Sequence, residues 1–226
     1  MKSSTAETLK SSLVPVCVMG MALFAYGLFY FANGLVYERM QFGDLADNFV
    51  MFSYQYSGLA RGEYPLWNPL NRTGEPLYFM QALFMANPIS NITIIISLLF
   101  GGTDVYFTFL TYNYALTVLY VIGIYQVVYT LTRNHYSSTF GGILALGSVV
   151  TLLMYTNTEP LIVYSAPWMF YGLVRYFREF DFKFLSIFIL AIVTSIYSYE
   201  VVYTLGFLFV FLISWLIFFR DLFNMD

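Results

Sequence analysis

The chain has 226 residues and a formal net charge of -3, and 59% of its residues are hydrophobic whereas only 10% are charged. A soluble domain carries roughly 25% charged residues, so this composition cannot cover a water-exposed surface and predicts a protein that lies mostly in lipid. One cysteine excludes an intramolecular disulfide and a cysteine-based zinc site, and the acidic balance with a single histidine gives no basic surface for nucleic acid.

The first apolar run, residues 13–36, is predicted to be a retained transmembrane helix. It contains no charged residue, and it exceeds the roughly 20 residues that a helix needs to cross a hydrocarbon core of about 30 Å. Lys2 and Lys10 precede it, as in a signal peptide, but the run is too long for one and no small-x-small cleavage site follows.

Residues 38–103 form the one long region that is not simply apolar, and they are predicted to be a long first loop that contains interfacial helices. The apolar stretch within 89–100 is too short to span a membrane and ends at Gly101 and Gly102, which favours an interfacial or re-entrant helix. The region also carries five carboxylates and three arginines, namely Glu38, Asp44, Asp47, Glu63, Glu75, Arg39, Arg61 and Arg72.

The remaining apolar sequence, residues 104–219, is predicted to form five further helices. These are 106–131, 139–156 and 161–176, and then two helices from the long run 184–219, which a polar break at 195–200 divides. The chain is therefore expected to be an all-α polytopic membrane protein, a single membrane domain over 1–226 with about six transmembrane helices. Seven of its ten lysines and arginines would lie on the side of the two termini, so the positive-inside rule predicts cytoplasmic termini and an outward first loop.

Asp44 and Asp47 are the candidate catalytic residues, because they follow the first predicted span and are one helical turn apart. Such a pair can accept a proton from a sugar hydroxyl as a general base, or it can hold a divalent cation, with Asp44 as the ligand. The spacing is equally that of two solvated acids at the start of a loop.

Arg39, Arg61 and Arg72 are candidate substrate-binding residues for a phosphate or pyrophosphate group, since a guanidinium supplies paired donors and permanent charge. The alternative is that each neutralises a neighbouring acid of the same loop.

Tyr64 and Trp67 can stack on a sugar ring, or they can anchor the loop at the membrane interface, where these residue types collect. Glu200 lies in the polar break between the last two predicted helices, and a carboxylate near the membrane plane is a functional candidate. An acid at a helix end can also simply reach water.

Three blocks of the first loop resemble the corresponding loop of YfhO-like bacterial membrane proteins, which belong to the GT-C class of polyprenyl-phosphate-sugar-dependent glycosyltransferases. The blocks are G-D-L at 43–45, G-L-A-R-G-E-Y-P-L-W-N-P at 58–69 and G-E-P-L at 74–77. The resemblance covers roughly residues 13–205, and it implies a GT-C-like fold with an outward active site under the first loop and Asp44 as the first-loop carboxylate.

The resemblance further implies a bacterial cytoplasmic (inner) membrane location, a polyprenyl-phosphate-linked sugar as donor and an outward-facing acceptor. A divalent cation is a candidate cofactor. Since GT-C enzymes carry further helices, the alternative expectation is a non-catalytic or truncated GT-C-like membrane subunit. Such a subunit would bind a partner, such as a second membrane subunit, or a lipid-linked glycan.

Overall fold

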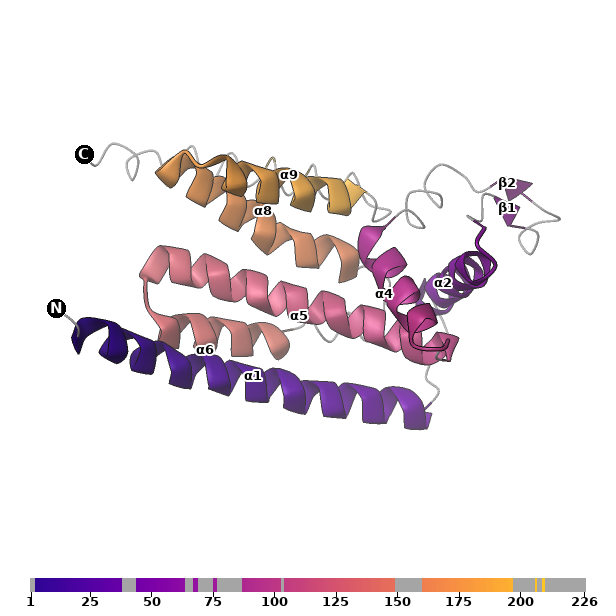
Figure 1. Cartoon of the computed structure of the whole chain (residues 1–226), viewed down its shortest axis with the longest axis horizontal. Coiled ribbons are helices and arrows are strands. Elements are labelled where there is room, and N and C mark those ends of the chain that lie inside the picture. The colour runs from indigo at the N-terminus through magenta and orange to yellow at the C-terminus, as the bar shows by residue number, and fades with distance from the viewer. Residues whose placement is uncertain are drawn as a thin grey trace.

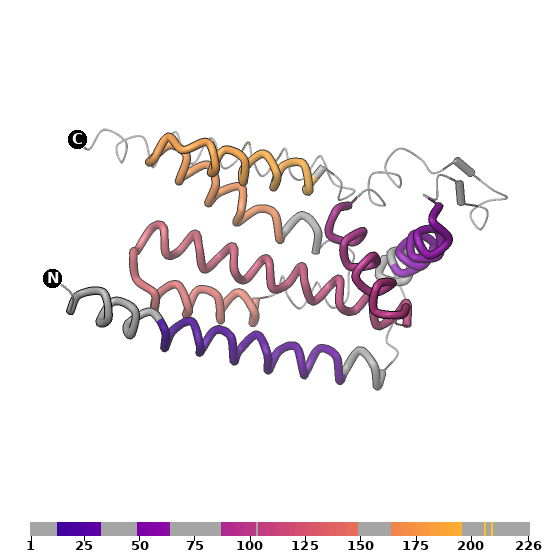
Figure 2. Tube along the Cα trace, viewed as in Figure 1, coloured from indigo at the N-terminus to yellow at the C-terminus, as the bar shows by residue number. Residues whose placement is uncertain are grey.

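The computed structural model describes residues 3–37, 44–63, 67–68, 75–76, 87–102, 104–148 and 160–196, with Gly206 and Phe209 as single positions (Figures 1 and 2). Side chains are described for 13–32, 49–63, 87–102, 104–148 and 164–195, and for those two positions. Over these residues the fold is all-α. Its helices are α1 (Ser3–Tyr37), α2 (Asp44–Ala60), α4 (Pro88–Leu99), α5 (Val105–Thr132), α6 (His135–Leu146), α8 (Pro160–Glu179) and α9 (Phe182–Ile196). The strands β1 (Trp67–Asn68) and β2 (Glu75–Pro76) form one short antiparallel pair.

Among the described helices, α1 and α5 are long and apolar enough to cross a membrane, over Leu13–Ala32 and Val105–Thr132 respectively. The 28 residues of α5 extend about 42 Å at a rise of about 1.5 Å per residue. Asp104 caps its first turn by accepting hydrogen bonds from the backbone N–H groups of Tyr106 and Phe107 at 2.7 and 3.1 Å. The helix ends at Arg133, which adopts a left-handed conformation with φ of 53°. The predicted helices at 13–36 and 106–131 are therefore confirmed as helices.

The beginning of α1, the α5–α6 turn and the α8–α9 turn lie at one end of the helical bundle, whereas α2, α4 and the strand pair lie at the other (Figure 1). Side-chain contacts between the helices agree with this arrangement. Thr139 of α6 donates from Oγ1 to the carbonyl of Pro15 in α1 at 3.0 Å, and Arg178 of α8 donates to the carbonyl of Thr130 in α5 at 2.9 Å. Four of the basic residues that were predicted to lie on the side of the N-terminus are on or beside the elements at the end where α1 begins. They are Arg133, Arg175, Arg178 and Lys183.

Close approach at glycines holds the later helices together. A Cβ atom at Gly172 of α8 would lie 2.8 Å from the carbonyl oxygen of Phe184 and from the backbone nitrogen of Phe188, both in α9. A Cβ atom at Gly123 of α5 would lie 2.9 Å from the Cβ of Pro167 in α8. Small residues at such contacts let helix backbones approach closely, as they do in membrane bundles.

The other predicted helices meet the structure to different extents. The prediction at 161–176 is confirmed as α8, which begins at Pro160, and 184–195 lies within α9. The predicted helix 139–156 begins earlier, as α6 at His135, and it also ends earlier, at Leu146, where Gly147 is the C-cap. The prediction of one unbroken helix over 139–156 is therefore wrong at residues 147–148, and residues 149–156 lie outside the described residues. The sixth predicted helix also lies outside them, apart from Gly206 and Phe209.

Candidate functional site

The two candidate carboxylates lie at the beginning of α2, the helix that follows α1. Asp44 is the first residue of α2 and Asp47 is one turn further on, so the predicted helical spacing is confirmed for the backbone. Their side chains lie outside the described residues. The structure describes the side-chain contacts of the rest of α2. These contacts fix the helix and therefore the position of its first turn.

One face of α2 is anchored by aromatic packing against α5. Phe52 is fully buried, and its ring centroid lies 5.3 Å from that of Phe109 and 5.5 Å from that of Tyr112. Phe49, one turn closer to the carboxylates, packs edge-on against Tyr106 and Phe109 at 5.7 and 5.5 Å. Such edge-to-face and offset pairs are favourable beyond the area that they bury. The cluster extends to Ile94 of α4 and, beyond α5, to Tyr164 of α8, so α2 is packed on α4 and α5.

A buried polar cluster joins α2 to the first turn of α4. Nε2 of Gln55 donates to Oδ1 of Asn91 at 2.8 Å and to Oγ of Ser90 at 3.1 Å. Ser90 Oγ and Asn91 Nδ2 donate in turn to the carbonyl of Asn87 at 2.9 and 3.0 Å. Gln55, Asn87 and Ser90 are fully buried. We call these four residues the α2–α4 amide cluster.

Asn87 also begins α4, because its Oδ1 accepts a hydrogen bond from the backbone N–H of Ile89 at 2.9 Å and Pro88 follows at the first helical position. Its Nδ2 is buried and has no hydrogen-bond partner among the described residues. A buried donor without a partner is costly, so this amide is a place where a bound water or ligand group would be stabilised.

The predicted substrate-binding residues divide into those the structure describes and those it does not. Arg61 lies just after α2 and is exposed, and its Nε is 3.4 Å from Oε2 of Glu63. This contact is the neutralising pair that the sequence left open as the alternative to phosphate binding. Trp67 is described by its backbone alone, which pairs with Pro76 in the strand pair. Arg39, Arg72, Tyr64 and Glu200 lie outside the described residues.

The described residues contain no group of three or more histidine, cysteine, aspartate or glutamate side chains that could hold a metal ion. Because the side chains of Asp44 and Asp47 are not among them, the divalent-cation prediction stays a prediction.

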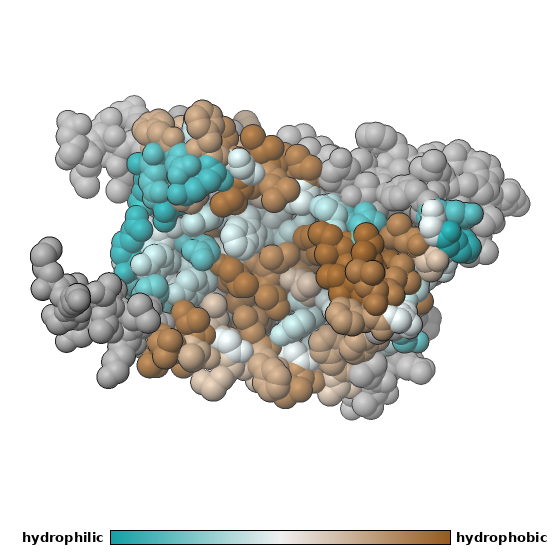
Figure 3. All heavy atoms as spheres, in the orientation of Figure 1, coloured by the Kyte–Doolittle hydropathy of each residue, from teal (hydrophilic) through white to brown (hydrophobic). Residues whose placement is uncertain are grey.

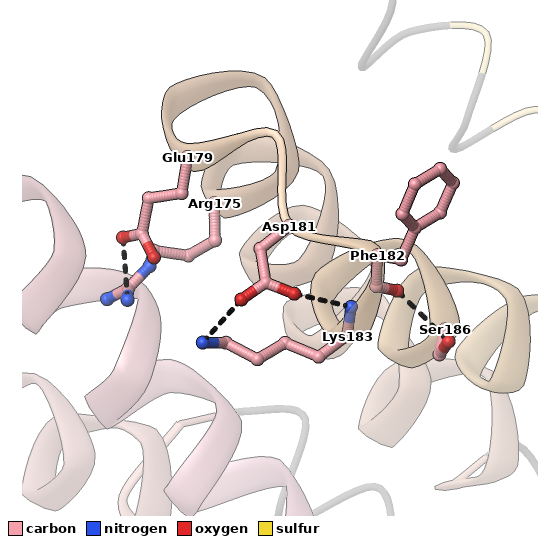
Figure 4. Close-up of polar contacts among 6 residues, drawn as sticks. All are labelled: Arg175, Glu179, Asp181, Phe182, Lys183 and Ser186. Atoms are coloured by element: carbon pink, nitrogen blue, oxygen red, sulfur yellow. Dashed lines mark hydrogen bonds and ion pairs between the residues drawn. The ribbon is translucent and has the colours of Figure 1, made fainter.

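The opposite end of the bundle holds a set of ion pairs around the α8–α9 turn (Figure 4). Arg175 pairs with Glu179 at 2.6 Å and lies over the ring of Phe184 with its Cζ 4.5 Å from the centroid. Lys183 pairs with Asp181 at 2.7 Å. Hydrogen bonds from the side chain and the backbone N–H of Lys183 lower the pKa of the Asp181 carboxyl. Each of these four charged side chains thus has an ion-pair partner within the set.

Sequence reasoning did not find the α2–α4 amide cluster. The available signals were the Asn87-Pro88 helix start and the polar residues Ser90, Asn91, Thr93 and Ser97 within an uncharged helix. Gln55 gave no local signal, because its partners lie about 35 residues further along the chain.

Comparison with known proteins finds no family model, no curated protein and no solved structure that matches this chain. The described part of the chain is helical, and two of its helices, α1 and α5, are by length and composition candidates to cross a membrane. The resemblance to YfhO-like proteins is therefore a hypothesis carried by the first-loop residues.

Proposed function

We propose that this chain is a polytopic membrane protein of the bacterial cytoplasmic membrane that transfers a sugar from a polyprenyl-phosphate donor to an outward-facing acceptor. The observation that carries the proposal is the start of α2. Two carboxylates one turn apart begin a helix that follows the apolar α1 and is fixed against α4 and α5. This arrangement supports a preorganised acid pair at one end of a helical bundle.

The orientation of the bundle supports an outward position for this pair. Arg133, Arg175, Arg178 and Lys183 are on or beside the elements at the end opposite α2. Loops rich in lysine and arginine stay in the cytoplasm, so the end that carries α2 and α4 would face outward. Six crossings with both termini in the cytoplasm accommodate this orientation.

The proposed chemistry is an inverting displacement at the anomeric carbon of the donor sugar. Asp44 accepts the proton of the acceptor hydroxyl as the new bond to the anomeric carbon forms, and Asp47 assists it. The bond to the lipid phosphate breaks at the same time. The developing negative charge on that phosphate is stabilised by one or more of Arg39, Arg61 and Arg72. In the alternative, Asp44 would act not as the base but as the ligand of a divalent cation, which would neutralise the same phosphate.

A second candidate function is favoured by the Arg61–Glu63 pair. Glu63 already neutralises the one candidate arginine that the structure describes with its side chain, which suits a loop that docks a partner or a lipid-linked glycan without catalysis. In that case the chain is a GT-C-like membrane subunit, with a second membrane protein as its partner.

Substitution of the carboxylates separates the two functions. The Asp44→Asn and Asp47→Asn variants would be assayed in membranes for sugar transfer from a polyprenyl-phosphate donor. Loss of a general base is expected to lower the rate about 100-fold or more. Asp181→Asn, at the other end of the bundle, is the matched control and should leave transfer unchanged. Full activity in both Asp44→Asn and Asp47→Asn would reject the proposed roles, and binding of the donor without any transfer by the unaltered protein would favour the second function.

A further inference from the structure

The helix α4 turns most of its large apolar side chains outward and buries two serines, unlike a helix on the surface of a soluble protein. The residues that it buries against the rest of the molecule are Ser90, Ile94 and Ser97. The large side chains that it turns outward are Ile92, Ile95, Ile96 and Leu99, followed by Phe100, with exposed fractions between 47% and 83%. A helix in contact with water places its apolar stripe inward and its polar face outward.

The inward polar groups of α4 find partners inside the protein. Ser90 belongs to the α2–α4 amide cluster, and Ser97 Oγ lies 2.9 Å from Oγ1 of Thr108 in the first turn of α5. The hydroxyl of Thr93 donates to the carbonyl of Ile89 at 2.8 Å. In an apolar medium a polar group must be satisfied internally, and this pattern meets that requirement on the side facing the protein.

The length and composition of α4 agree with an apolar surrounding that the helix does not cross. Residues 87–102 include no charged side chain. The 12 residues of the helix extend about 18 Å, well short of a hydrocarbon core of about 30 Å. The Ser97–Thr108 contact fixes its end beside the first turn of α5, which is itself one of the two candidate spans.

Exposed apolar side chains continue over several other helices rather than stopping at α4. They include Met21, Phe24 and Leu28 on α1, Phe140 and Leu144 on α6, and Ile189 and Leu190 on α9. Figure 3 shows hydrophobic atoms over much of the face on which α4 lies. A single protein partner would cover one patch, whereas exposure on many helices is what a surrounding lipid solvent requires.

We propose that α4 is a non-spanning helix whose outer face, formed by Ile92, Ile95, Ile96, Leu99 and Phe100, lies in the acyl-chain region of the bilayer. The amide cluster and the Ser97–Thr108 contact hold its polar side to the protein. The helix thereby ties α2 to the membrane at a fixed depth. This inference depends on membrane insertion and not on sugar transfer, so either can fail without the other.

Depth-dependent fluorescence quenching tests this placement in the full chain. Cys17 is exposed and would be labelled, so a Cys17→Ser background would carry single cysteines at Ile95, at Leu99 or, as the water-facing control, at Glu63, whose side chain is 70% exposed. Each variant would be labelled with an environment-sensitive dye and reconstituted into phosphatidylcholine vesicles. Doxyl-labelled lipids and aqueous iodide would serve as the two quenchers.

Doxyl lipid should quench the labels at Ile95 and Leu99 several-fold more strongly than iodide, and the order should be reversed at Glu63. Strong quenching by iodide at both α4 positions would overturn the proposal, since the face would then lie in water. Protection from both quenchers would overturn it as well, because the face would then be covered by protein, for example by a second copy of the chain. Thermal unfolding of each variant, compared with that of the Cys17→Ser background, would confirm that the labelled protein is folded.

Discussion

The side-chain amide of Gln55 on α2 donates a 2.8 Å hydrogen bond to the amide oxygen of Asn91 on α4, although the two residues are 36 positions apart in the chain. The same Gln55 nitrogen also donates to Ser90. Buried hydrogen bonds of this kind specify one arrangement of two helices, since any other arrangement leaves the same polar groups unpaired. The pair therefore couples the helix that begins with the candidate carboxylates to the helix that we place in lipid.

Replacement of Gln55 by leucine should destabilise the contact between α2 and α4. The substitution roughly keeps the volume but removes the hydrogen bonds from Gln55 to Ser90 and Asn91. Such a loss costs about 1–3 kcal/mol for a buried polar group. Thermal unfolding and limited proteolysis in detergent would measure the loss. Ser57→Ala, at an exposed position of the same helix, is the matched control. A Gln55→Leu protein as stable as the control would show that the cluster does not hold the two helices together.

Replacement of Gly172 by alanine should separate α8 from α9. The new Cβ would lie 2.8 Å from backbone atoms of Phe184 and Phe188, which cannot move aside as a flexible side chain can. Overpacking of this kind costs about 1–3 kcal/mol. The change would be followed by the midpoint of thermal unfolding. Gly20→Ala on α1, where the added methyl meets nothing within 4 Å, should instead leave the midpoint equal or raise it, because alanine favours a helix. An equal effect of both substitutions would contradict the close contact.

Loss of the Asp104 side chain should weaken the beginning of α5. Its carboxylate accepts two backbone N–H groups of the first turn, and removal of such a cap costs about 1 kcal/mol. Asp104→Ala should therefore lower the free energy of unfolding, whereas Asp104→Ser, which restores an acceptor at the cap, should recover most of the loss. Equal destabilisation by alanine and serine would mean that the negative charge, not the capping hydrogen bond, is what matters there.

Acid should selectively weaken the α8–α9 turn. Hydrogen bonds from Lys183 lower the pKa of Asp181 from its ordinary value of 3.8. A carboxyl whose folded-state pKa is depressed adds stability above its unfolded-state pKa, and this contribution is lost as the pH falls through the lower folded-state pKa. Unfolding midpoints measured from pH 6 downward should thus fall less steeply in Asp181→Asn than in the unaltered protein. Parallel curves for the two proteins would contradict the linkage.

Hydropathy predicted the helices at 13–36, 106–131 and 161–176, because the signal acts over a few residues, but it missed the end of α6 at Leu146. The first apolar run is α1, and Pro160 begins α8 where a proline is favoured at a helix start. The site was predicted less completely. The helical spacing of Asp44 and Asp47 is present in the backbone of α2, whereas Gln55 and Asn87 were not found as members of a polar cluster. Their roles depend on contacts between segments distant in the chain.

The amino-acid composition alone predicts an apolar surrounding for this protein, because so few charges cannot cover a surface in water, and the lengths of the apolar runs predict helices. Only the tertiary structure decides which side of each helix meets the protein and which meets that surrounding. On α4 it turns Ser90 and Ser97 inward and Ile95 and Leu99 outward. The physical reason is that each hydroxyl needs a partner, and those partners, Gln55 and Thr108, come into reach only when α2 and α5 have packed around the same helix.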